Sequence, residues 1–161
     1  MAVGENVNSG HVEHPRGIYP ARVDDKGRLK LPADFHKYLL EIGAAKVFVT
    51  SFDERIARIY PIPVWRQVEA LLSNAGEDAE VAEDLLFIAN DLGNDTDLDP
   101  NGRLLIPAPL RKVMNAESQP MWLEFQKGYI NVFGEEVYEE RKQRAIANRG
   151  DKLKAFVKKG L

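Results

Sequence analysis

Short apolar runs, several of them alternating with polar residues, recur along the chain and predict β-strands. They fall into two groups with the same order and similar spacing. The first group comprises 18–23, 29–31, 46–51 and 56–60, and the second comprises a run ending at 97–98, then 104–106, 121–125 and 129–133. A glycine-containing segment separates the first two runs of each group, so we expect two strands flanking a tight turn.

A proline follows the second strand of each group and predicts the start of a helix. The fixed φ of Pro32 and Pro107 suits the first turn of a helix. We expect the first of these helices to end near Ile42, because Gly43 can adopt the left-handed conformation that often follows a helix. Each group is thus β-α-β-β in outline.

Helical spacing also marks the segments between and after the two groups. Residues 64–73 and 79–92 predict a helical connector, and the stretch from Glu135 predicts a C-terminal helix that frays near Gly150. The expected apolar face of the second connector helix is Val81, Leu85, Ile88 and Leu92. We expect the apolar residues of the first connector helix, Val64, Trp65 and Val68, to be core rather than a platform for stacking bases.

The two groups are copies of one module. Aligning Asp24 with Asp99, an offset of 75 residues, gives six identities in ten positions over 24–33 and 99–108. The similarity continues into the later strands of each copy with an offset of 73. The shared residues with a structural role in the turn and helix start are Asp24, Gly27, Pro32, Asp99, Gly102 and Pro107.

Each copy has only about 50 residues, which is too few to bury a comfortable core alone. Two β-rich halves would also leave exposed edge strands. We therefore expect one pseudo-twofold barrel built from both copies. The expected organisation is a flexible N-terminal tail (1–14), a first repeat (15–68), an acidic helical connector (69–93), a second repeat (94–140) and a basic helical tail (141–161).

Charge is distributed unevenly along the chain. The net charge is −3, yet 141–161 carries eight Lys or Arg against one Asp, and no Lys or Arg occurs between Glu77 and Asp99. The chain has no cysteine, which excludes disulfides and thiolate metal sites and is typical of a reducing cytoplasm. No apolar run reaches the roughly 20 residues of a membrane helix, and the N-terminal residues have no signal-peptide pattern.

Four sequence motifs resemble the MraZ family of the AbrB/SpoVT-like superfamily of transcription regulators. They are Arg16-Gly17, the Asp24 to Pro32 module, the segment Tyr60-Pro-Ile-Pro-Val-Trp65, and the Asp99 to Pro107 module. This resemblance implies an α+β fold with a swapped-hairpin β-barrel, ring-shaped homo-oligomers, and binding to repeated promoter boxes of a division and cell-wall gene cluster. The chain departs from the family pattern at Asp34 and His36, where an arginine-rich helix start is typical, and in its acidic connector.

The repeated turn has residues suited to DNA binding. An Asp four residues before an Arg can cap backbone amides and orient the guanidinium, so that Arg28 and Arg103 point outward as forks for phosphate or guanine. The first copy adds Arg22, Lys26 and Lys30 at spacings that would share one face of a strand. Because the second copy lacks such a cluster, we expect the two halves to contact DNA unequally. A purely structural Asp–Arg salt bridge is the alternative.

Other chemistries fit the sequence poorly. The segment from Asp97 to Gly102 imitates half of a calcium-binding loop, but Ala108 stands where the bidentate Glu belongs. His11 and His14 lack an evident third metal ligand, and no catalytic triad, phosphate-binding glycine loop or convergent carboxylate pair occurs. We therefore expect no enzyme activity, cofactor or metal.

The sequence thus predicts a cytoplasmic, nucleoid-associated transcription regulator that binds double-stranded DNA as a ring-like homo-oligomer and has no membrane partner. The alternative is a structural or protein-interaction ring of the same fold that does not bind DNA. A basic tail that contacts phosphates would add affinity by releasing counterions.

Overall fold

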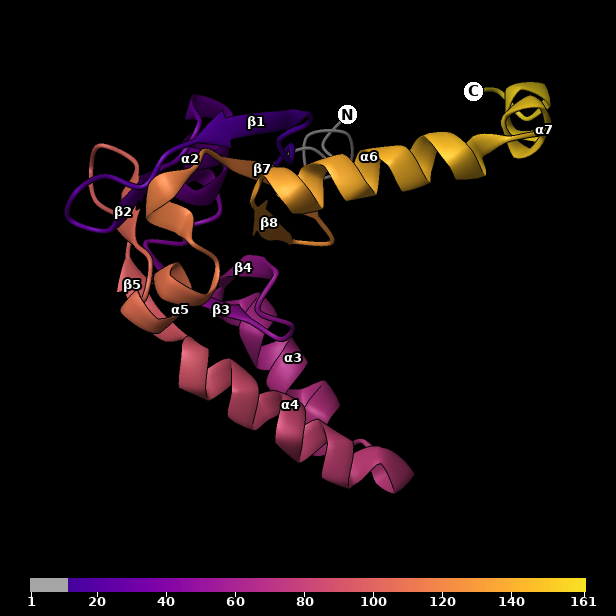
Figure 1. Cartoon of the computed structure of the whole chain (residues 1–161). Coiled ribbons are helices and arrows are strands. Elements are labelled where there is room, and N and C mark those ends of the chain that lie inside the picture. The colour runs from indigo at the N-terminus through magenta and orange to yellow at the C-terminus, as the bar shows by residue number, and fades with distance from the viewer. Residues whose placement is uncertain (1–11) are drawn as a thin grey trace, which may run out of the picture.

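A computed structural model describes residues 12–161 and shows an α+β fold with a six-stranded antiparallel sheet and a separate two-stranded ribbon (Figure 1). The sheet has the order β1-β7-β8-β4-β3-β5, and the ribbon pairs β2 with β6. The strands are β1 (Ile18–Ala21), β2 (Arg28–Lys30), β3 (Lys46–Ser51), β4 (Ile56–Pro61), β5 (Asn94–Asp97), β6 (Arg103–Leu105), β7 (Met121–Gln126) and β8 (Tyr129–Phe133). The helices are α2 (Ala33–Glu41), α3 (Ile62–Ser73), α4 (Ala79–Leu92), α5 (Ala108–Val113), α6 (Glu135–Arg149) and α7 (Lys152–Lys158), with 3₁₀ turns η1 (Gly76–Asp78) and η2 (Ala116–Ser118).

The two sequence copies exchange strands. β1 of the first copy pairs with β7 of the second, and β5 of the second copy pairs with β3 of the first. The strands flanking the first turn are joined only by a bridge between Val23 and Leu29, because the main partner of β2 is β6 of the other copy. The exchange therefore covers β7 and β3 with a strand of the other half, and β1 and β5 form the two edges of the sheet.

The main core lies where the two copies meet. Leu29 and Leu104 face each other across the β2–β6 pair and are 0% and 1% exposed. These two residues are also equivalent in the sequence repeat, so a pseudo-twofold axis passes between them. Apolar residues from both copies surround the pair and include Phe35, Leu39, Val47, Ile59, Leu110, Leu123 and Ile130.

The helices after the two prolines form as predicted, with one change of position. Pro32 and Pro107 are N-cap residues with extended ψ, so each helix begins one residue later than we expected. The first helix ends before Gly43, whose φ of +74° confirms the predicted left-handed position.

The connector is a helical hairpin of α3 and α4 that projects from the sheet (Figure 1). Trp65 is buried and stacks on Phe48, which confirms its predicted place in the core. The predicted apolar face of α4 is wrong at Val81, which is 59% exposed, while Ala82 and Ala89 are buried instead.

The C-terminal helix α6 is fixed to the body at its beginning. The ring of Trp122 stacks on Tyr138 at 4.2 Å, and its Nε1 donates to Glu135 at 2.8 Å. Arg55, on the turn between β3 and β4, donates to Glu140 at 2.6 Å. The remainder of α6 extends away from the sheet and contains no buried residue (Figure 1).

The C-terminal helix ends at the predicted Gly150, but a second helix follows it in place of the predicted fraying. Gly150 has a φ of +36° and ends α6, after which α7 begins at Lys152. Within residues 12–161, no helix combines the length and hydrophobicity needed to cross a membrane.

Candidate nucleic-acid interface

The carboxylate of Asp24 organises the turn that precedes β2. Its Oδ1 accepts hydrogen bonds from the backbone amides of Lys26 and Arg28, both at 2.9 Å. Its Oδ2 accepts from Nε of Arg28 at 3.0 Å. One carboxylate therefore caps the turn and orients the guanidinium, as the sequence predicted.

The second turn has the same backbone but a freer arginine. Oδ1 of Asp99 accepts from the backbone amides of Asn101 and Arg103, both at 2.9 Å. In the described part of the chain, the guanidinium of Arg103 makes no hydrogen bond or ion pair. The predicted bracing of arginine by aspartate is thus present in the first copy and absent from the second.

Both turn aspartates are held in the charged form. The hydrogen bond from the Arg28 amide, aided by that from Lys26, lowers the pKa of Asp24 below its usual 3.8. The hydrogen bond from the Arg103 amide, aided by that from Asn101, lowers the pKa of Asp99 in the same way. Arg28 also lowers the pKa of Asp99 through its charge, which places the two turns within electrostatic reach of each other.

The β2–β6 ribbon brings cations from both copies onto one face. Arg28 and Lys30 point away from the buried side that carries Leu29, and Lys30 lies directly opposite Arg103. Leu105, which is 48% exposed, lies opposite Arg28. We call Arg28, Lys30 and Arg103 the ribbon cations. Arg103 therefore lies beside the cations of the first copy rather than at a separate second site.

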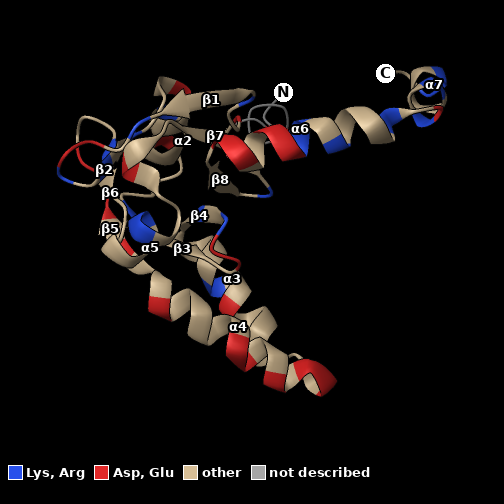
Figure 2. Ribbon diagram, viewed as in Figure 1, with Lys and Arg blue, Asp and Glu red and all other residues tan. Residues whose placement is uncertain are grey.

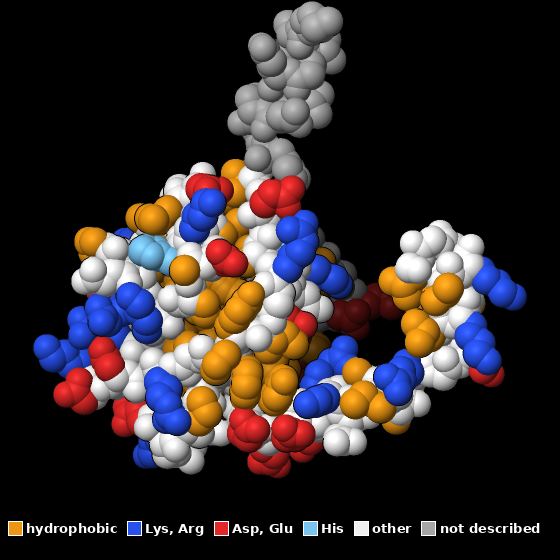
Figure 3. Space-filling model, turned by 90° about the horizontal axis from the view of Figure 1, so that it is seen from above, with side chains coloured by type: hydrophobic (Ala, Val, Ile, Leu, Met, Phe, Trp, Pro, Cys, Tyr) orange, Lys and Arg blue, Asp and Glu red, His pale blue; other side chains and the backbone are white. Residues whose placement is uncertain are grey.

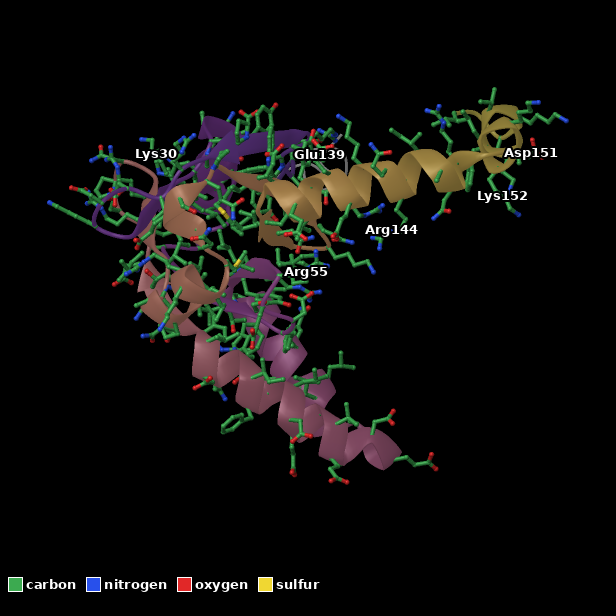
Figure 4. All side chains as sticks on the ribbon, in the orientation of Figure 1. Lys30, Arg55, Glu139, Arg144, Asp151 and Lys152 are labelled. Atoms are coloured by element: carbon green, nitrogen blue, oxygen red, sulfur yellow. The ribbon has the colours of Figure 1, made fainter. Side chains whose placement is uncertain are left out.

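The other two predicted cations lie beside the ribbon on different elements. Arg22 follows β1, and the register of the Val23–Leu29 bridge sets it opposite Lys30. Lys26 is exposed in the turn itself. The expectation that Arg22, Lys26 and Lys30 share one strand is wrong, because the chain reverses direction between Arg22 and Lys30. The three residues nevertheless belong to one end of the molecule, where Lys30 is labelled in Figure 4.

Known proteins of similar sequence belong to the family that the motifs resemble. The chain is 34% identical over 125 residues, 78% of its length, to the transcriptional regulator MraZ of Acidobacterium capsulatum, of which it covers 85%. It is 37% identical over 105 residues, 65% of its length, to the MraZ of Koribacter versatilis, of which it covers 71%. The chain belongs to the MraZ family. No family model matches it.

Each turn of this MraZ-family chain accepts a backbone hydrogen bond from the other copy. The amide of Leu31 donates to the carbonyl oxygen of Gly102 at 2.8 Å, and the amide of Ile106 donates to that of Gly27 at 3.0 Å. The two glycines have φ values of +81° and +79°, which L side chains rarely adopt. The predicted role of both glycines is confirmed, and the crossed hydrogen bonds fix the arginines on either side of the pseudo-twofold axis.

Two further residues shape the turns, and sequence reasoning did not assign them this role. A Cβ added to Gly27 would lie 2.5 Å from Cζ of Arg111, and one added to Gly102 would lie 2.9 Å from Nδ1 of His36. Arg111 also donates to Oε1 of Glu117 at 2.9 Å and to the carbonyl oxygen of Ile106. The sequence contained a signal, because His36 and Arg111 are equivalent under the 75-residue offset that aligns the copies.

The segment of the second copy that resembles a calcium-binding loop forms a capped turn in the structure. The Oδ1 atom of Asp99 accepts backbone amides, and no group of three or more potential metal ligands occurs in the described residues. His11 of the weak histidine pair, like most of the predicted N-terminal tail, lies outside the described residues.

Proposed function

We propose that this chain is a sequence-specific DNA-binding regulator of transcription that contacts promoter repeats through the ribbon cations. The carrying observation is the juxtaposition of Arg28, Lys30 and Arg103 on one face, with Lys30 directly opposite Arg103. Like charges at directly opposed positions destabilise a β-sheet, and a bound polyanion reverses that effect. The relatives that carry the name transcriptional regulator support this assignment.

The geometry favours DNA over a small anion. Arginine presents a planar set of donors that matches either a phosphate or the edge of guanine, and Asp24 fixes this plane at Arg28. Arg22 and Lys26 extend the positive surface beside the ribbon. One ribbon offers few contacts, so several copies in one particle are needed to supply affinity through avidity.

We propose the finer architecture on the same basis. The strand exchange between the repeats at 15–68 and 94–140 supports a swapped-hairpin barrel. A ring-like homo-oligomer would set several such barrels against repeated boxes in the promoter of a division and cell-wall gene cluster. Such a particle would associate with the nucleoid.

The decisive experiment is a mobility-shift titration with DNA from upstream of the protein's own gene. We expect Arg28→Ala to keep the fold and particle size but to abolish binding. Arg103→Ala should weaken binding less, because Arg103 is not oriented by its aspartate. The matched control is Arg66→Ala, which removes one exposed cation from α3. Unchanged binding by Arg28→Ala refutes the proposed role of the turn arginine.

A structural or protein-interaction ring is the second candidate, favoured by the acidic connector. From 67 to 93 the chain has seven acidic and no basic residues, and such a surface repels DNA. A salt series separates the candidates, since electrostatic DNA binding weakens linearly on a log–log plot as salt rises. A ring without a nucleic-acid partner would show no shift even at low salt.

A further inference from the structure

Two arms leave the body in different directions, and their outer parts are opposite in charge (Figure 2). The α3–α4 arm is acidic, whereas the α6–α7 arm carries eight Lys or Arg against one Asp over 141–161. Neither α6 nor α7 contains a buried residue. Within the described chain, the lysines of α7 and the acidic residues of α4 form no ion pair.

The outer face of α4 combines acid with an exposed aromatic ring. Phe87 is 72% exposed, and nothing in the described chain covers it. Helical spacing surrounds it with carboxylates three, four or seven residues away. We define the acidic face of α4 as Glu80, Glu83, Asp84, Phe87 and Asp91.

The tail helix has the complementary pattern. Phe156 is 58% exposed and lies on one side of α7 with Leu153 and Val157, which are also about half exposed. Figure 3 shows apolar side chains gathered on one side of the tail. Nζ of Lys159 lies 5.5 Å from the centre of the Phe156 ring. We define the tail face as Lys152, Leu153, Lys154, Phe156, Val157, Lys158 and Lys159.

We propose that the tail face of one copy binds the acidic face of α4 in a second copy. Opposite charges would pair around two exposed phenylalanines, so that apolar area is buried while the carboxylates and ammonium groups remain at the wet rim. The proposal rests on the self-association proposed above and names the contact that produces it. The contact joins two different surfaces, so it repeats head to tail and closes a ring where the rotation permits.

The structure favours this occupant over DNA and over the same chain. Phosphates would pair with the lysines but would leave the apolar side of α7 exposed to water. Lys152 and Arg144 also lie at the opposite end of the molecule from Lys30, so the tail does not extend the ribbon cations within one chain (Figure 4). The acidic face of the same copy is out of reach because the two arms diverge (Figure 1).

Charge reversal tests the contact in the full chain. The tail variant carries Lys152→Glu, Lys154→Glu, Lys158→Glu and Lys159→Glu, and the α4 variant carries Glu80→Lys, Glu83→Lys, Asp84→Lys and Asp91→Lys. Sedimentation velocity should show smaller particles for each variant alone and wild-type particles for an equimolar mixture. The matched control for the tail variant makes the same change in net charge on the body with Lys37→Glu, Lys46→Glu, Lys112→Glu and Lys127→Glu, and it should leave particle size unchanged.

Cross-linking gives a readout that does not depend on the variants. A zero-length carbodiimide applied to a mixture of ¹⁴N- and ¹⁵N-labelled wild-type chains should join tail lysines to acidic-face carboxylates between differently labelled chains. Circular dichroism and thermal unfolding confirm that each variant is folded, and a variant that fails this check leaves the decision to the cross-linking. Cross-links between the two faces that occur only within one chain overturn the proposal, as does the absence of cross-links between the faces.

Other outcomes assign the tail elsewhere and also overturn the proposal. One is a tail variant with unchanged particle size but weaker DNA binding, and another is unchanged size but lost sedimentation with anionic phosphatidylserine vesicles. Arg28→Ala, which should assemble normally without binding DNA, separates failure of the proposed contact from failure of the DNA-binding function. A wild-type chain that stays monomeric overturns the contact while its DNA binding is still measured.

Discussion

Truncation of Leu29 tests whether the two repeats share one core. Leu29 is fully buried opposite Leu104, at the point where residues of both copies meet. Leu29→Ala removes about three buried methyl or methylene groups at about 0.8 kcal/mol each, and the cavity left behind raises the total to about 3–4 kcal/mol. Because the lost contacts belong to both copies, we expect the whole chain to lose stability in one cooperative transition.

Urea denaturation followed by tryptophan fluorescence and by circular dichroism measures this effect at a fixed protein concentration. Leu105→Ala is the matched control, since Leu105 is on the same ribbon but half exposed, and it should cost only about 1 kcal/mol. Leu29→Ala combined with Leu104→Ala should be non-additive, because the two side chains face each other. Two separate transitions, only one of which responds to Leu29→Ala, would refute a shared core.

Two further predictions concern the turns. Gly27→Ala should destabilise the chain more than Gly43→Ala. Both positions have positive φ, which costs an alanine about 1–3 kcal/mol, but only the Cβ added at 27 meets Arg111. Equal changes in the free energy of unfolding would argue against the close contact with Arg111. The lowered pKa values of Asp24 and Asp99 mean that their stabilising effect is complete above the unfolded value of 3.8 and is lost as pH falls through the lower folded value. The melting temperature of Asp24→Asn should therefore fall less than that of the wild type between about pH 5 and pH 3, and equal falls would refute the stabilising role of Asp24.

Local signals in the sequence were sufficient for the individual elements. The turn at Asp24, the end of the first helix at Gly43 and the later strands of each copy all follow from residue types within a few positions of one another. Such features depend on backbone conformation and on local hydrogen bonds, which one segment determines alone. The roles of Asp24 and Gly27 in the turn were predictable for this reason.

Features that depend on distant partners were not predictable from the same signals. No local pattern indicates that β1 pairs with β7 or that Arg103 lies opposite Lys30. The face of α4 was assigned wrongly at Val81 because its buried side also uses Ala82 and Ala89, whose weak hydrophobicity does not mark them as core positions. The contact of Arg111 with the first turn was equally hidden, although the repeat offset pairs Arg111 with His36.

Because the two copies exchange strands, the equivalent arginines Arg28 and Arg103 can differ in whether an aspartate binds them. Each turn takes a backbone hydrogen bond and a close side-chain neighbour from the other copy, so the position of Arg28 depends on the second repeat as well as on Asp24. The second repeat gives this support through the amide of Ile106 and the side chain of Arg111, and neither requires Arg103 to be held by its aspartate. The support of the fold and the orientation of a turn arginine can therefore be divided between the two copies. Replacing Asp99 and replacing Asp24 should accordingly have different effects. The first change removes only backbone capping, whereas the second also releases the side chain of Arg28.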